Sequence, residues 1–214
     1  MQRACGEFIE TLAPVAPQVE LSINLSPIQL HRGDPLALIA QTLERYQLPP
    51  SALDIEIPES AILEDVAKAT EIVRALREAG MSVTIDDFGT GYSSLSHLRN
   101  LPVNRIKIDL SFVRQIGRDA HSEAIIKANL FLSSSLNIRA TAEGVETLQQ
   151  LDFLQRHGCS EIQGYLFCKP LSASDMVSYL KTFSINDYLA ADERSRRERD
   201  VRPPPIDADR LLKG

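Results

Sequence analysis

The sequence predicts an α/β fold: a TIM-like (β/α) barrel that is incomplete at its N-terminal side, with about six βα units present. Strand-like and helix-like segments alternate along the chain with short connections, which is typical of parallel βα units. In four of the strand-like segments, apolar side chains occupy one face and polar side chains the other. A doubly wound sheet needs apolar residues on both faces, so this pattern favours a barrel with a polar lumen.

The expected strands are short segments with period-two alternation. Val83 and Ile85, for example, share one face, while Thr84 and Asp86 share the other. The strands are expected at residues 19–25, 53–57, 82–85, 105–108, 139–142 and 161–162. A complete barrel has eight strands, so we expect two βα units to be missing on the N-terminal side.

The expected helices carry apolar residues at helical spacing. Gly80 and Gly158 stand where glycines commonly end helices. Residues 1–12 have one apolar helical face but no N-cap, so we expect a helix that is entered part-way along. The other helices are expected at residues 35–46, 65–79, 122–136, 147–157 and 174–183.

Residues 1–189 are predicted to form one domain, because 214 residues with 43% hydrophobic content suffice for one sizeable core. The segment 190–214 is charged and rich in proline, so it buries too little apolar surface to order itself. We expect a disordered tail there, with a basic interaction arm as the alternative. The net charge of −6 disfavours non-specific binding to a nucleic acid polymer.

Cys5, Cys159 and Cys168 are odd in number and show no metal-ligand spacing. They argue against a disulfide framework or a zinc site and fit a reducing compartment, so we expect a cytoplasmic protein. No apolar run approaches the ~18 residues that span a bilayer. The sequence therefore predicts no membrane segment.

Asp86 and Asp87 follow the β-branched run of residues 83–85 and precede a turn that contains Gly89 and Gly91. Adjacent carboxylates repel one another unless a cation or a shared proton neutralises them. A divalent metal site is one interpretation and a turn cap is the other, and the pair by itself favours the cap. The triplet 87–89 also occurs in protein kinases, but the other kinase motifs are absent, which excludes that class.

Polar residues recur at the ends of the expected strands. They are Asn24, Glu59, Asp86, Asp87, Lys107, Glu143 and Gln163. Each by itself is typical of a solvated or capping residue. Gathered on one rim, oxygen ligands and a lysine are what metal-assisted phosphodiester hydrolysis requires, because hard cations polarise phosphate and lower the pKa of bound water.

Six sequence blocks carry a family resemblance. They are SINLS (22–26), EIPES (56–60), DDFGTGYSSL (86–95), IKID (106–109), AEGVET (142–147) and QGY (163–165). In this order they resemble the EAL domains, bacterial phosphodiesterases that open cyclic di-GMP to the linear dinucleotide pGpG. The resemblance runs up to about Pro170, and its strength lies in the combination, since each block alone is weak.

The resemblance implies a set of metal ligands. Asn24, Glu59 and Asp86 are expected to ligate one Mg²⁺ or Mn²⁺ ion. Asp87 is expected to help bridge to a second ion, and Glu143 to act as a further ligand or as a general base.

The resemblance also implies roles in catalysis and regulation. Lys107 is expected to hold or polarise the attacking water, and Gln163 to orient water or substrate. Glu146 is expected to anchor the loop of residues 87–95, which in the family couples dimerisation to metal binding. A solvated strand-end lysine and a helix-start carboxylate are the alternatives for Lys107 and Glu146.

The chain departs from the family pattern at two places. The Glu-Ala-Leu segment that names the family is absent, and its glutamate is a ligand of the first metal, so the loss is expected to weaken the site. Pro58 stands where threonine is usual, and Glu59 has the parity of Ile57 rather than that of Glu56. A bulge or turn at Pro58 is therefore needed to aim Glu59 at the metal, and Glu56 is the fallback ligand.

The sequence leaves two functions open. The first is metal-dependent hydrolysis of cyclic di-GMP to pGpG, impaired by the truncation. The second is a catalytically inactive cyclic di-GMP receptor or protein-interaction module, as the missing glutamate and strands suggest. The resemblance also implies a homodimer and an upstream sensor or cyclase domain.

Overall fold

The computed structural model describes residues 1–17, 19–91 and 100–183. The chain divides into two compact units, Met1–Leu180 and Lys181–Gly214. Every strand of the described part lies in the first unit. The tail predicted at residues 190–214 lies outside the described residues.

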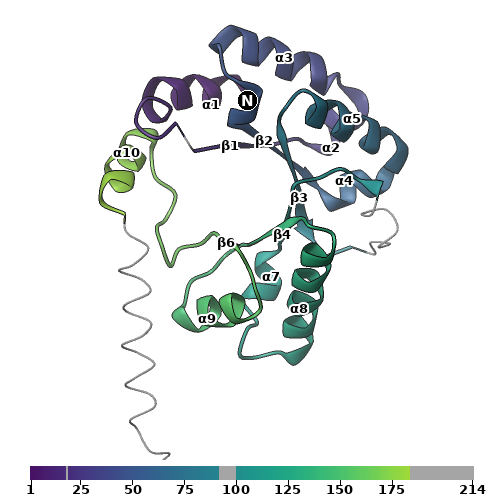
Figure 1. Cartoon of the computed structure of the whole chain (residues 1–214), viewed down its shortest axis with the longest axis vertical. Helices are drawn as coiled ribbons and strands as arrows, with labels where there is room; N and C mark the ends of the chain where they lie inside the picture. Colours follow the sequence, from purple (N-terminus) through teal and green to yellow (C-terminus); the bar gives the residue numbers. More distant parts are fainter. Residues whose placement is uncertain (18, 92–99, 184–214) are drawn as a thin grey trace, which may run out of the picture. The chain divides into compact units, whose positions relative to one another are not determined.

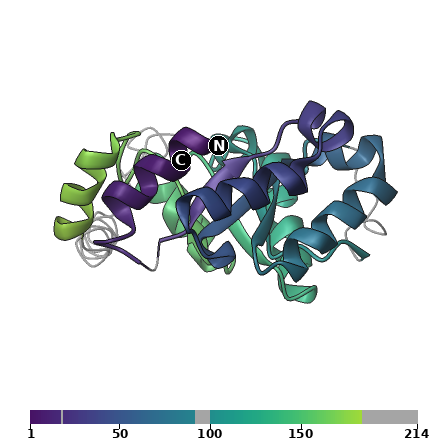
Figure 2. The same ribbon diagram turned by 90° about the horizontal axis from the view of Figure 1, so that it is seen from above.

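One parallel sheet of six strands, in the order β1-β2-β3-β4-β5-β6, forms the centre of the first unit. The strands are β1 (Leu21–Asn24), β2 (Leu53–Pro58), β3 (Ser82–Phe88), β4 (Arg105–Ile108), β5 (Arg139–Ala142) and β6 (Glu161–Ile162). Figure 1 shows the sheet curled around an inner face with helices on its outer side, and Figure 2 shows the same helices from above. The incomplete barrel predicted from the alternation of elements is therefore confirmed.

The longer helices begin at side-chain caps that the sequence carries. Asp34, Asp65, Asp119 and Thr147 each accept a hydrogen bond from a backbone N–H of the first turn. These helices are α3 (Pro35–Tyr46), α5 (Val66–Glu78), α8 (Ala120–Ser135) and α9 (Leu148–Arg156). Helix α10 spans Ala173–Thr182, and the first segment divides into α1 (Gln2–Glu7) and a π-helical turn (Phe8–Leu12). Met1, at the N-cap of α1, makes no side-chain cap hydrogen bond, as expected.

In the part of the chain that the structure describes, four short helical segments were not expected from the periodicity. They are α2 (Pro27–Arg32), a 3₁₀ turn (Pro50–Ala52), α4 (Glu59–Glu64) and α7 (Leu110–Val113). Segments of one or two turns are too short to show an apolar period, so only their caps mark them. Ser26 and Gln29 form a reciprocal capping box at α2, and Asp109 caps α7.

The apolar core lies between the sheet and the covering helices. Ile55, Ile57 and Ile106 of the strands are completely buried, as are Val73 and Leu76 of α5. None of the helices in the described part is both long and apolar enough to cross a membrane. The polar positions of the strands lie on the opposite face, where several of their charged side chains are also buried.

Candidate functional site

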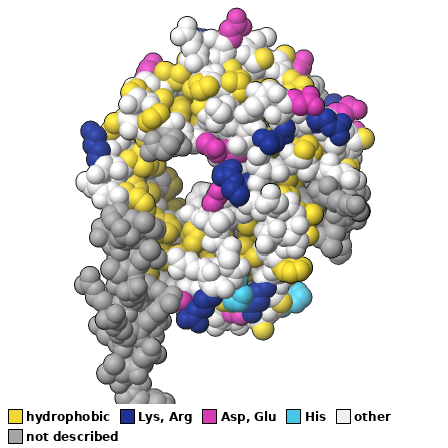
Figure 3. Space-filling view, in the orientation of Figure 1, with side chains coloured by type: hydrophobic (Ala, Val, Ile, Leu, Met, Phe, Trp, Pro, Cys, Tyr) yellow, Lys and Arg dark blue, Asp and Glu magenta, His cyan; other side chains and the backbone are white. Residues whose placement is uncertain are grey.

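Lys107, near the carboxyl end of β4, is surrounded by carboxylates from three other parts of the sheet. Its Nζ atom lies 3.0 Å from Glu56 Oε2, 3.4 Å from Asp86 Oδ1 and 2.5 Å from Glu143 Oε1. We call these four residues the rim cluster. Acidic and basic side chains adjoin one another on the inner side of the sheet in Figure 3.

The lysine of this cluster is held in its charged form. Burial opposes the charge, but hydrogen bonds and attraction from Glu143 and Glu56 outweigh it and raise the pKa of Lys107 well above its ordinary value. Lys107 therefore acts as a fixed positive charge rather than as an acid or base.

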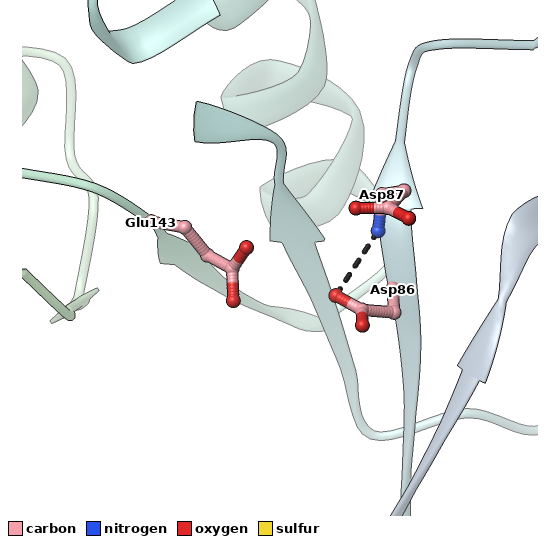
Figure 4. Close-up of side chains that lie close together, drawn as sticks. All are labelled: Asp86, Asp87 and Glu143. Carbon is pink, nitrogen blue, oxygen red and sulfur yellow. Dashed lines mark hydrogen bonds between the residues drawn. The ribbon is translucent and has the colours of Figure 1, made fainter. Parts of the chain in front are cut away.

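Strand β3 is irregular where its two aspartates lie. The pairing register with β4 shifts between Ile85 and Phe88, and Asp87 has a φ of 55° in the left-handed region. Neighbouring side chains of a regular strand point to opposite faces; here the turn at Asp87 brings both carboxylates to the same side. The Asp87 N–H donates to Asp86 Oδ1 at 3.1 Å, as Figure 4 shows.

Asp86, Asp87 and Glu143 form a group that can hold a metal ion. One carboxylate oxygen from each lies within 4.8 Å of the others, and Figure 4 shows the three side chains near one another. Burial, followed by the charge of Asp86, raises the pKa of Asp87. Burial also raises the pKa of Glu143, although Lys107 opposes that change. The three carboxylates of this group outnumber the single positive charge of Lys107. This excess of negative charge suits divalent cations.

Glu59 is the first residue of α4, so the strand ends at Pro58 as the predicted turn requires. Its Oε2 atom accepts hydrogen bonds from the Gly89 N–H at 3.0 Å and the Gly91 N–H at 3.3 Å. Its Oε1 atom is buried without a partner among the described residues. Burial raises the pKa of this carboxyl group, the two backbone donors oppose the rise, and Asp87 adds to it. An unpartnered buried acceptor fits a metal ligand.

The remaining predicted residues make no contact with Lys107 among the described interactions. Asn24 ends β1 and is exposed, in register with Glu56. Gln163 follows β6 with an exposed side chain, and its backbone carbonyl accepts from the Val145 N–H at 3.1 Å. Glu146 pairs with Arg114 at 3.8 Å. Residues 92–95 of the loop that Glu146 was expected to anchor lie outside the described part, so this role stays a prediction.

Glu56 lies nearer to Lys107 than its sequence position indicated. It was expected only as a fallback metal ligand, whereas the structure pairs it directly with Lys107. The strand parity carried the signal, because Glu56 lies on the polar face of β2 two residues after Asp54.

The raised carboxyl pKa values predict how metal binding should depend on pH. A group whose pKa is higher in the folded state than in the unfolded state stabilises the fold at low pH, and this contribution is lost as pH rises through the folded pKa. Glu59, Asp87 and Glu143 behave in this way, and a cation binds them only when they are deprotonated. We expect excess Mn²⁺ to raise the melting temperature by about 5 °C or more at about pH 7.5 and by much less at about pH 5.

Differential scanning fluorimetry with and without Mn²⁺ at the two pH values measures this difference. The Asp86→Asn variant, which lacks one carboxylate of the group, is the control and should show a smaller rise at the higher pH. Equal stabilisation of the wild-type chain at both pH values would contradict the assignment of these carboxylates as ligands.

Comparison with known proteins identifies the family. The EAL domain model matches residues 1–170. The bifunctional diguanylate cyclase/cyclic di-GMP phosphodiesterase MucR of Pseudomonas aeruginosa is 37% identical over 158 residues, which are 74% of this chain and 23% of that protein. This chain spans between 20% and 28% of the length of the curated relatives compared with it.

Solved structures agree with this result. A structure of the PaMucR phosphodiesterase in complex with c-di-GMP has a TM-score of 0.79 at 35% identity, covering 82% of this chain and 71% of that chain. Klebsiella pneumoniae BlrP1 with manganese and cyclic di-GMP has a TM-score of 0.71 at 32% identity, covering 79% and 42%. The chain thus belongs to the EAL domain family.

Proposed function

We propose that this chain is a metal-dependent phosphodiesterase domain that hydrolyses cyclic di-GMP to pGpG. The observation that carries the proposal is the rim cluster, where several carboxylates face one buried lysine and leave negative charge for divalent cations to neutralise. The unpartnered Glu59 oxygen is a second observation in its favour. The named activities of the relatives support the choice of substrate.

Each residue has a role that follows from its position. Asp86, Asp87 and Glu143, with Glu59 and Asn24, would hold Mg²⁺ or Mn²⁺. The metal, when bound, supplies polarisation of the phosphate and a lowered pKa of water.

Lys107, Glu143 and Gln163 would take part in the reaction itself. The fixed charge of Lys107 can hold the attacking water and stabilise negative charge that develops on the phosphate. Glu143 is the candidate to accept a proton, because burial raises its pKa. Gln163, exposed at the end of β6, can orient the substrate.

The proposal predicts that pGpG forms when this chain is incubated with cyclic di-GMP and Mn²⁺. Asp86→Ala removes a metal ligand and a partner of Lys107, so we expect the rate to fall about 10²-fold or more. Chromatographic separation of the nucleotides measures the product. Glu71→Ala, which removes an exposed carboxylate of α5, is the matched control and should keep the wild-type rate. Wild-type turnover by Asp86→Ala would refute the assignment of Asp86.

A cyclic di-GMP receptor without catalysis stays the second candidate from the sequence. It predicts nucleotide binding by calorimetry together with no Mn²⁺-dependent product. The homodimer, the upstream sensor or cyclase domain and the cytoplasmic location stay predictions from the sequence. Size-exclusion chromatography with light scattering tests the first of these.

A further inference from the structure

A second group of polar side chains lies on the inner face of the sheet, nearer to the amino ends of the strands than the rim cluster. We call it the base layer. It consists of Asp54, Thr84, Arg105, Thr141 and Glu161. Four of its members stand two residues before a rim cluster residue on the same strand or its continuation: 54 before 56, 84 before 86, 105 before 107, and 141 before 143. The two groups are thus stacked along the strands, about 7 Å apart.

Arg105 connects the members of the base layer. Its Nη1 atom donates to Asp54 Oδ2 on β2 at 2.6 Å, and its Nη2 atom donates to Glu161 Oε1 on β6 at 3.5 Å. Its Nε atom lies 2.5 Å from Glu161 Oε2 as an ion pair, without the geometry of a hydrogen bond. A further contact of 3.5 Å reaches Glu20, in the segment before β1. The Arg105 side chain is only 12% exposed and that of Asp54 is fully buried. One guanidinium group therefore joins β4 to strands on both sides of it.

Two threonine hydroxyl groups are further partners of these carboxylates, as are Ser22 for Asp54 and Arg139 for Glu161. Thr84 donates to Asp54 at 2.9 Å, and Thr141 donates to Glu161 at 2.8 Å. Hydrogen bonds from Thr141 and the charges of Arg105 and Arg139 outweigh burial and lower the pKa of Glu161, so it stays ionised. The base layer is therefore a paired network, whereas the rim cluster has excess negative charge.

The sheet gives this network a mechanical role. Among the described strands, β1 and β6 do not pair with one another, so backbone hydrogen bonds do not close the curl of the sheet. Backbone hydrogen bonds set the spacing of neighbouring strands, and side chains that reach across the inner face can hold the distance between strands that are not neighbours, such as β2 and β6. A planar guanidinium group that contacts two carboxylates at once fixes both direction and distance, which a single ammonium group does not do.

We propose that Arg105 is a positioning residue that holds β2, β4 and β6 at the separation at which the rim carboxylates meet Lys107. Among the described contacts it touches no rim residue, so it acts through the strands. Since Asp54 and Glu56 share β2, and Arg105 and Lys107 share β4, a change of spacing in the base layer is carried to the rim. The link to catalysis rests on the proposed function, but the effect on Lys107 does not.

The first test observes the Lys107 ammonium group by nitrogen-15 NMR of lysine side chains in the full chain, assigned with Lys107→Met. Three carboxylate contacts should slow its hydrogen exchange enough to give a resolved signal. Arg105→Lys keeps the charge but cannot contact Asp54 and Glu161 together, so we expect the signal to shift or vanish. The Lys68 ammonium group, which donates to the His31 carbonyl at 2.7 Å, reports whether the rest of the fold is intact.

The matched control is Arg139→Gln. Arg139 also pairs with Glu161, at 2.8 Å, but it is 46% exposed and has no contact with β2 among those described. Arg139→Gln removes a positive charge from beside Glu161, whereas Arg105→Lys keeps its charge, so an unspecific electrostatic effect would disturb the Lys107 signal more in Arg139→Gln than in Arg105→Lys. We expect the Lys107 signal to persist in Arg139→Gln.

The second test measures Mn²⁺ affinity by calorimetry in the same proteins. We expect affinity about tenfold weaker in Arg105→Lys and within about twofold of wild type in Arg139→Gln. If Arg105→Lys does not fold, Glu161→Gln replaces it, because that change keeps the Arg105–Asp54 pair and weakens only the link to β6.

The outcomes separate the positioning role from the phosphodiesterase activity. An unchanged Lys107 signal and unchanged Mn²⁺ affinity in folded Arg105→Lys, or in Glu161→Gln where that variant stands in, would overturn the positioning role. A changed Lys107 signal in a chain whose wild type hydrolyses no cyclic di-GMP would support the positioning role and refute only the phosphodiesterase activity.

Discussion

Replacing Lys107 with methionine is expected to destabilise the metal-free chain by about 3 kcal/mol or more. The variant keeps an aliphatic chain of similar length but leaves three carboxylates of the rim cluster without their shared cation. Removing one partner of a buried ion pair is costly, because the remaining charges stay desolvated. Urea unfolding followed by circular dichroism gives the free energy of unfolding.

The same variant should respond more strongly to metal than the wild type. Divalent cations can neutralise the carboxylates that Lys107 no longer contacts, so Mn²⁺ should restore part of the lost free energy of unfolding. Hydrolysis of cyclic di-GMP should be lost even with Mn²⁺, because the ammonium charge that we propose to hold the water is missing. With Mn²⁺, Lys107→Met would then regain stability without regaining activity. A general folding defect would change both together.

The control is Lys169→Met, at an exposed position after β6. Surface substitutions of this kind change the free energy of unfolding by about 0.5 kcal/mol or less. The interpretation of the rim cluster would be wrong if Lys107→Met were equally mild, or if Mn²⁺ stabilised it no more than it stabilises the wild type.

Gly164→Ala is expected to disrupt the site from outside the rim cluster. A Cβ atom at Gly164 would lie 2.1 Å from the Val145 carbonyl oxygen and 2.3 Å from the Val145 nitrogen, which are backbone atoms that no rotamer change can move. The Val145 N–H donates to the Gln163 carbonyl at 3.1 Å, and the Leu166 N–H donates to the Val145 carbonyl at 2.9 Å. The segments after β5 and β6 are therefore locked together through this contact.

Alanine would force these segments apart, and they carry Glu143 and Gln163. We expect a loss of about 3 kcal/mol in the free energy of unfolding, at the upper end for overpacking, and loss of Mn²⁺-dependent hydrolysis. Urea unfolding and the chromatographic assay measure the two effects.

Gly158→Ala provides a matched glycine control. Gly158 has a φ of +80°, so alanine there is strained, but no atom lies within 4 Å of the added Cβ. The cost should be about 1 kcal/mol, with activity retained in the folded protein. Similar losses of activity in Gly164→Ala and Gly158→Ala would show that the close contact between residue 164 and Val145 is not the cause of the lost activity.

Much of the fold could be predicted from local patterns. The bounds of β4, β5, β6 and α3 agree with the expected segments. Period-two alternation and capping residues are local signals, which can be recognised from neighbouring residues in the sequence. The short helices α2, α4 and α7 were missed, since one or two turns carry no measurable period. Helix α4 matters most, because it begins at Glu59 and removes the parity conflict seen in the sequence.

By itself, the sequence determined which strands have a polar face and that Asp86, Lys107 and Glu143 lie near their carboxyl ends. Only the tertiary structure decided that Glu56 pairs with Lys107 while Glu59 receives the backbone N–H groups of Gly89 and Gly91. The Arg105 network was likewise decided by the tertiary structure. The physical reason is that alternation is a local property of each strand, whereas contacts across the inner face depend on the register, tilt and curl of strands far apart in the chain.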